Sequence, residues 1–133
     1  MKYMLDTNIC IYTIRRQPAQ VIDRFRQHHI GEIGISSITA AELWYGVEKS
    51  TQRKKNSKAL EQFLFPLEIA PFNIEAAAAY GMIRSLLESE GKPIGSLDTL
   101  IAAHARNLDL VLVTNNEREF KRVPKLRIEN WTV

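Results

Sequence analysis

The stretch MLDTNIC, residues 4–10, decides how the start of the chain is expected to fold. Its apolar beginning ends in an acid, a hydroxyl and an amide, Asp6, Thr7 and Asn8, before apolar residues resume at Ile9. A short apolar run that ends this way is typical of a buried strand followed by the first turn of a helix. The polar triplet is therefore either a helix cap or part of a functional site.

Other short apolar runs alternate with longer stretches that have helical spacing. Strands are predicted over 33–35, 67–70 and 110–113, with a short last strand within 126–131. Helices are predicted over 18–29, 36–50, 56–65, 73–91 and 96–109. Because short, continuously apolar runs are typical of strands buried on both faces, they predict parallel strands covered by helices. The alternation predicts an α/β fold with a mostly parallel central sheet.

The composition is that of an ordinary globular protein. The chain has 133 residues, of which 45% are hydrophobic and 25% charged, so we expect one domain spanning residues 1–133. Its single cysteine, Cys10, cannot form an internal disulfide, and the default location is therefore the cytoplasm. No apolar run approaches the roughly 20 residues needed to cross a bilayer, so no membrane partner is expected.

The basic residues gather in two segments. Residues 49–58 contain five lysines and arginines and no acid, and residues 118–127 contain five more, out of 18 in the chain. Taken alone, each segment is most simply a solvated surface. They indicate a polyanionic partner only if an acidic metal site lies between them.

Polar side chains are expected to gather at one edge of the sheet. In open parallel sheets, ligands bind beyond the carboxyl ends of the strands. Four groups of residues fall at such positions, namely Asp6; Ser36, Ser37 and Glu42; Asp98; and Thr114, Asn115 and Asn116.

Each of these residues also has a purely structural explanation. Asp6 and Asp98 suit the first turns of helices, and Asn115 with Asn116 suits a turn. Glu42 is harder to explain in that way, because it lies in an apolar stretch where an unpartnered carboxylate would be costly. His104 follows Asp98 by six residues, which places it nearer the opposite helix face and favours a structural role.

Three carboxylates in a small volume repel one another unless a cation neutralises them. Oxygen ligands without a pair of histidines or cysteines at ligand spacing favour Mg²⁺ or Mn²⁺ over Zn²⁺. Such an ion lowers the pKa of a water that it binds, and this water can then attack phosphorus. The residues therefore indicate hydrolysis of a phosphodiester, which the flanking basic segments would help to bind.

The chain resembles the VapC toxins of bacterial type II toxin–antitoxin modules, which are PIN-domain ribonucleases. Four blocks carry the resemblance in order, namely MLDTNICIY, ISSITAAELWYGVEKS, GKPIGSLDTLIAAHA and LVLVTNNEREF. They span nearly the whole chain. The resemblance implies a three-layer α/β/α sandwich and cleavage of structured RNA that depends on Mg²⁺ or Mn²⁺, with the anticodon region of tRNA as the leading candidate.

The resemblance also implies roles for individual residues. Asp6, Glu42 and Asp98 would be the catalytic acids and metal ligands. The block near the end places Thr114 and Asn116 where many relatives have a hydroxyl and a fourth acid. The amide of Asn116 departs from that pattern and leaves the number of metal ions open. Glu119 is the candidate that would replace the missing acid, while Asn8 and Ser37 would orient ligands or waters.

The partners implied by the resemblance are a cognate VapB-type antitoxin, a second copy of the chain, and operator DNA bound only through the antitoxin. Apolar residues 43–47 and 59–65 would supply the antitoxin groove or, equally, plain core packing. Two other functions stay open. One is a non-catalytic RNA- or protein-binding module, which Asn116 allows, and the other is a Rossmann-like phosphatase, which the missing second acid at Asn8 disfavours.

Overall fold

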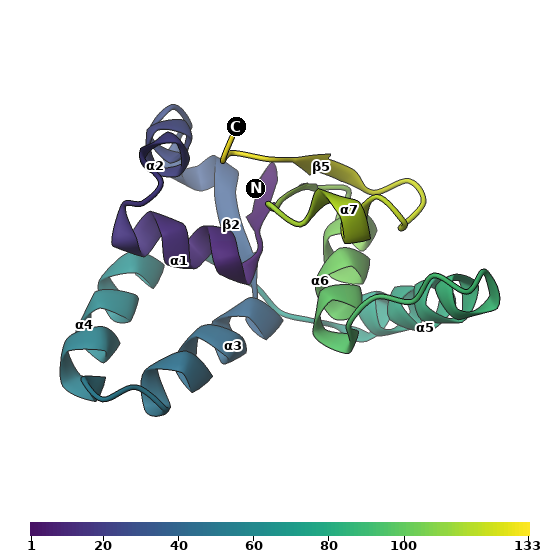
Figure 1. Cartoon of the computed structure of the whole chain (residues 1–133), viewed down its shortest axis with the longest axis horizontal. Helices are drawn as coiled ribbons and strands as arrows, with labels where there is room; N and C mark the ends of the chain where they lie inside the picture. Colours follow the sequence, from purple (N-terminus) through teal and green to yellow (C-terminus); the bar gives the residue numbers. More distant parts are fainter.

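The computed structural model describes residues 1–133, in which five short strands alternate with seven α-helices (Figure 1). The strands are β1 (Tyr3–Leu5), β2 (Ile33–Ser36), β3 (Glu68–Ala70), β4 (Val111–Val113) and β5 (Arg127–Glu129). They form one sheet in the order β3-β2-β1-β4-β5, and each neighbouring pair is parallel. The predicted α/β class is confirmed, and the sheet is parallel throughout rather than mostly so.

The helices match the predicted segments to within a few residues. They are α1 (Thr7–Arg15), α2 (Ala19–Arg26), α3 (Ser37–Glu48), α4 (Arg53–Leu64), α5 (Ile74–Ser89), α6 (Ser96–Asn107) and α7 (Glu117–Phe120). A 3-10 turn, Ile30–Glu32, leads into β2. The sequence did not predict α7, because a helix of four residues is too short to show a helical period.

Side chains from the two faces of the sheet enter separate cores. On β1, Met4 packs with Ile83 and Ile101 of the helices α5 and α6. The next residue, Leu5, packs on the other face among residues of α1, α3 and α4, together with Trp131. Because successive residues of a strand point to opposite faces, this division requires helices on both sides. The three-layer α/β/α sandwich is therefore confirmed.

The strand β3 differs from what its apolar sequence predicts. Glu68 is exposed and Ile69 is 41% exposed, whereas every residue of β2 is buried. The reason is that β3 is an outermost strand of the sheet and has a neighbouring strand on one side alone, so less of its surface is covered. The prediction of burial on both faces is therefore wrong for this strand.

Polar caps fix the helices that begin at the carboxyl edge of the sheet. The Asp6 carboxylate accepts a hydrogen bond from the Ile9 amide at 2.9 Å and starts α1 directly after β1. Ser36 does the same for α3, accepting from the Ile38 amide at 3.0 Å. Replacing such a cap by alanine typically costs about 1 kcal/mol. These caps hold the first turns of α1 and α3 close to the same sheet edge.

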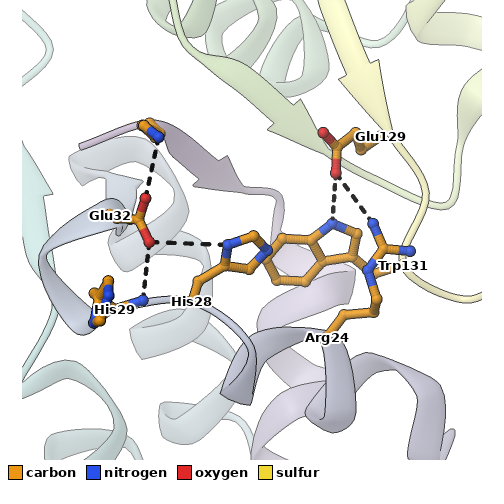
Figure 2. A network of polar contacts seen from close by, with 7 residues as sticks. Arg24, His28, His29, Glu32, Glu129 and Trp131 are labelled. Atoms are coloured by element: carbon orange, nitrogen blue, oxygen red, sulfur yellow. Dashed lines mark hydrogen bonds and ion pairs between the residues drawn. The ribbon is translucent and has the colours of Figure 1, made fainter.

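The end of the chain is fastened to α2 by a polar and aromatic network (Figure 2). Glu129 accepts hydrogen bonds from the Trp131 indole at 3.0 Å and from the Arg24 guanidinium at 3.3 Å. The His28 ring stacks on Trp131 with an interplanar angle of 12°. These contacts, together with the complete burial of Trp131, explain why β5 is held at its place in the sheet.

No helix combines the length and the apolar character that a membrane span requires.

Candidate active site

The carboxyl ends of β1 and β4 lie side by side and bring the predicted polar residues together. Leu5 pairs with Val113, so the residues that follow them, Asp6 and Thr114, leave the sheet at the same level. The charges of Glu42 and Asp98 both reach Asp6 strongly enough to raise its pKa. The three predicted acids therefore form one group, which we call the acid cluster: Asp6, Glu42 and Asp98.

Asp6 is the most buried member of the acid cluster, with 5% of its surface exposed. Burial, and to a smaller extent the charges of Asp98 and Glu42, raise the pKa of Asp6 to about 6. Hydrogen bonds from the Thr114 side chain and the Ile9 amide oppose this rise without cancelling it. The structural and the functional explanation of Asp6 are compatible, because the helix cap is also the buried acid of the cluster.

Glu42 projects from the second turn of α3 toward α1. The Thr7 hydroxyl donates a hydrogen bond to its carboxylate at 2.7 Å, and Glu42 is half-buried. This bond supplies the partner that a carboxylate in an apolar stretch needs. The sequence shows Thr7 only as a member of the polar triplet after the first strand, and nothing in it indicates a link to a residue 35 positions away.

Asp98 lies in the first turn of α6, and Glu119 of α7 faces it. Burial raises the pKa of Asp98, and the charges of Glu119 and Glu42 raise it further. The Asn116 amide donates a hydrogen bond to the Glu119 carboxylate at 3.1 Å. Asn116 thus holds Glu119 at the edge of the acid cluster, an arrangement consistent with Glu119 as a fourth acid.

Thr114 is fully buried and connects Asp6 to the loop that contains Asn116. Its hydroxyl is hydrogen-bonded to Asp6 and accepts a hydrogen bond from the backbone N–H of Asn116 at 2.9 Å. The hydroxyl therefore serves as a donor toward the carboxylate and as an acceptor toward the loop. Its position agrees with the supporting role predicted for it.

Two other predicted supporting residues are placed differently. The Ser37 hydroxyl accepts a hydrogen bond from the Phe72 amide at 3.0 Å, so it ties α3 to the loop after β3. Asn8 is exposed in the first turn of α1, and its predicted role in orienting waters stays a prediction. His104 is buried with its ring 2.8 Å from the Ser36 hydroxyl, in agreement with a structural role.

The donor set fits a magnesium or manganese ion that keeps waters in its shell. No three acidic, histidine or cysteine side chains come close enough to hold a metal ion by themselves. Mg²⁺ is usually bound through one or two carboxylates, with waters and substrate phosphates completing its shell. Burial is the main cause of the raised pKa values of Asp6 and Asp98, and the charges of the neighbouring acids add to it. A divalent cation would offset both effects, because it favours the ionised carboxylates.

A groove with a volume of about 360 Å³ runs from Glu42 between α1, α3 and α4. Its apolar lining comes from Ile11, Ile14, Leu43, Val47, Ala59 and Leu60, and its polar lining from Arg15, Glu42, Lys49 and Asn56. Of the apolar residues predicted to form a partner groove, Leu43, Val47, Ala59 and Leu60 line it. Trp44 packs against the core instead, and Tyr45 lies outside the lining.

The comparisons with known proteins agree with this site. The model of the PIN domain matches residues 3–126, and the chain belongs to the PIN-domain family. It is 50% identical over 131 residues to Ribonuclease VapC2 of Haemophilus influenzae, a match that covers 98% of both chains. It is 46% identical over 132 residues, 99% of both chains, to the tRNA(fMet)-specific endonuclease VapC of Shigella flexneri. Within this family the chain therefore belongs with the VapC ribonucleases.

Solved structures support the same assignment. The DNA-bound VapBC from Salmonella typhimurium contains a chain that superposes with a TM-score of 0.93 at 45% identity, over 98% of both chains. VapBC2 from Rickettsia felis, bound to a DNA fragment from its promoter, gives a TM-score of 0.90 at 45% identity, over 98% of this chain and 99% of that chain.

Proposed function

We propose that this chain is a cytoplasmic, metal-dependent endoribonuclease, the toxin of a VapBC-type pair, and that it cleaves a structured RNA. The observation that carries the proposal is the acid cluster, gathered from three distant parts of the sequence at the carboxyl edge of a parallel sheet. The name of one similar protein, a tRNA(fMet)-specific endonuclease, supports tRNA as the substrate. The anticodon region, which the sequence resemblance implies, is the proposed target within it. In this proposal residues 1–133 form one catalytic domain.

The residues of the cluster have distinct tasks in this proposal. Of the three acids that the resemblance implies as metal ligands, Asp6 and Asp98 would hold Mg²⁺ or Mn²⁺ directly, and Glu42 would complete the site through a water. The ion supplies neutralisation of phosphate charge and activation of water when bound. Glu42, oriented by the Thr7 hydroxyl, would accept the proton of the attacking water as the water oxygen adds to phosphorus. The ribose oxygen leaves with the electron pair of the broken phosphorus–oxygen bond and takes a proton from solvent. Thr114 keeps the Asp6 carboxylate in place throughout.

The groove beside Glu42 is the proposed site of the cognate antitoxin. The solved relatives include complexes of VapB with VapC, some of them bound to DNA. An amphipathic segment of an antitoxin suits a groove that is lined by both apolar and charged residues. Because the groove reaches Glu42, a bound antitoxin would also block the acid cluster. Operator DNA would then contact the complex through the antitoxin.

The exposed face of α5 is the proposed contact with a second copy of the chain. Ile74, Met82 and Leu86 retain 78%, 64% and 39% of their exposure. Together with Ala78 they recur every four residues, which places them in one stripe along the helix. A continuous apolar stripe on a surface helix is typical of a protein interface. A dimer formed in this way could bind two antitoxins as a hetero-oligomer.

The substrate is tested by incubating the protein with initiator tRNA and, separately, with elongator methionine tRNA. We expect a discrete cut in the anticodon loop of the initiator tRNA, and little or no cut in the elongator. Equal degradation of both at many positions would contradict specificity for structured RNA. Release of inorganic phosphate without any cut would instead support the phosphatase alternative.

A further inference from the structure

An exposed aromatic side chain lies one helical turn beyond Glu42 on α3. Tyr45 retains 66% of its exposure, although aromatic rings are usually covered. The Lys49 ammonium lies 5.0 Å from the centre of its ring, over one face. The pair therefore presents a flat aromatic surface and a cation together to the solvent.

Helix geometry aligns this pair with the acid cluster. Residues three and seven positions after Glu42 lie within about 60° of it around the helix axis, and about 4.5 and 10 Å further along. Glu42, Tyr45 and Lys49, the residue that caps the end of α3, therefore form a single row. Lys49 and Glu42 also line the same groove, and Arg15 and Asn56 contribute polar groups from α1 and α4.

The charges along this row suit a polyanion whose reacting phosphate lies at the acid cluster. The cluster itself repels phosphate, so the flanking phosphates need cations nearby. Lys49 begins the basic segment 49–58, in which Arg53, Lys54, Lys55 and Lys58 are all exposed. Of these, Arg53 pairs with Glu48 at 3.9 Å. In the other basic segment Arg122 donates to the Pro93 carbonyl and Arg127 pairs with Asp109.

We propose that Tyr45 and Lys49 form a subsite for single-stranded RNA next to the scissile phosphate, with a base stacked on the Tyr45 ring and a neighbouring phosphate paired with Lys49. Aromatic rings in cationic surroundings bind unpaired RNA bases in this way. Tyr45 lies outside the lining of the apolar groove, so an antitoxin segment seated there would not need it. This inference rests on the proposed function and adds substrate-binding residues to it.

The test uses initiator tRNA as the probe and compares Tyr45→Ala, Tyr45→Trp and Lys49→Gln with the parent chain. Phe65→Ala is the matched control, because Phe65 is 91% exposed and precedes β3, at the sheet edge opposite the acid cluster. Cleavage kinetics give KM and kcat for each variant. Equilibrium binding is measured in an Asp98→Asn background, so that the tRNA stays intact.

We expect Tyr45→Ala to raise both KM and Kd about 5- to 100-fold with little change in kcat, as loss of one stacked base would. Tyr45→Trp should keep KM and Kd near the values of the parent chain, because tryptophan also stacks on a base. Phe65→Ala should have the same KM and Kd as the parent. Lys49→Gln should make the salt dependence of log Kd shallower by about 0.7, the value for one phosphate contact with single-stranded nucleic acid.

The inference is overturned if the parent cleaves the tRNA and Tyr45→Ala is as active, and binds as tightly, as Phe65→Ala. It is also overturned if Tyr45→Ala weakens only the complex with the cognate antitoxin, since Tyr45 would then serve a protein partner. If the parent binds the tRNA through Tyr45 without cutting it, the subsite stands and the proposed nuclease activity fails. No binding of the tRNA by any variant would contradict both.

Discussion

Replacing Asp6 with asparagine should stabilise the metal-free protein at neutral pH, although it removes a catalytic acid. Burial and the neighbouring acids raise the pKa of Asp6 from 3.8 to about 6 in the folded state. The folded protein therefore binds this proton more tightly than the unfolded chain does. Above pH 6 the ionised carboxylate is held in a place that disfavours its charge, and an amide has no such charge.

The magnitude follows from the size of the shift. At about 1.4 kcal/mol per pKa unit, a rise from 3.8 to about 6 corresponds to roughly 3 kcal/mol. Asparagine caps a helix about as well as aspartate, so the start of α1 should be kept. The hydrogen bond with Thr114 should weaken without the charge. We therefore expect a gain of about 1–3 kcal/mol in the free energy of unfolding.

The sign of the pH dependence is fixed by the same shift. The contribution of Asp6 to the stability of the parent is fully present below pH 3.8 and is lost as the pH rises through about 6. The Asp6→Asn variant should not lose stability in this way as the pH rises, because its amide does not ionise. The difference between the two proteins should therefore be small at low pH and reach its full value above pH 6.

Urea unfolding in EDTA, at several pH values between 4 and 8, measures this difference. Asp23→Asn is the matched control, because Asp23 is exposed on α2. The reasoning is refuted if Asp6→Asn is less stable than the parent at pH 8, or if its stability follows the same pH dependence as that of the parent.

Four further predictions concern the cluster and the proposed surfaces. Glu42→Gln should lower tRNA cleavage at least about 100-fold while circular dichroism shows an unchanged fold, because the proton acceptor is lost. Thr7→Val should lower kcat by less than Glu42→Gln, since it removes only the hydrogen bond that orients Glu42, and single-turnover kinetics measure both. Mg²⁺ or Mn²⁺ should raise the Tm of the parent by more than that of Asp6→Asn, as differential scanning fluorimetry would show. Met82→Arg should convert a dimer to a monomer in sedimentation, because it places a charge in the apolar stripe of α5.

The sequence predicted the acids of the site because their places depend on local patterns. Asp6 ends an apolar run, and Asp98 follows Gly95 and Ser96 at the start of a helical pattern. Because the strands are predicted to be parallel, these positions are expected at the same place, beyond the carboxyl ends of the strands. Their mutual influence on pKa values agrees with that expectation.

The features that the sequence did not predict depend on tertiary structure. The bond from Thr7 to Glu42 joins two helices, and no period or cap indicates it. The exposure of Ile69 follows from the order of the strands, which periodicity does not contain. The position of Glu119 depends on α7, a helix too short to be seen in the pattern, and on a hydrogen bond from Asn116.

The most direct test of the acid cluster is incubation of the purified protein, free of antitoxin, with end-labelled total tRNA. Parallel reactions contain Mg²⁺, Mn²⁺ or EDTA, and Asp98→Asn is run beside the parent. We predict discrete fragments with either metal ion, none in EDTA, and none with the variant. Equal cleavage by Asp98→Asn, or cleavage that persists in EDTA, would contradict the assignment of a metal-dependent nuclease to the acid cluster.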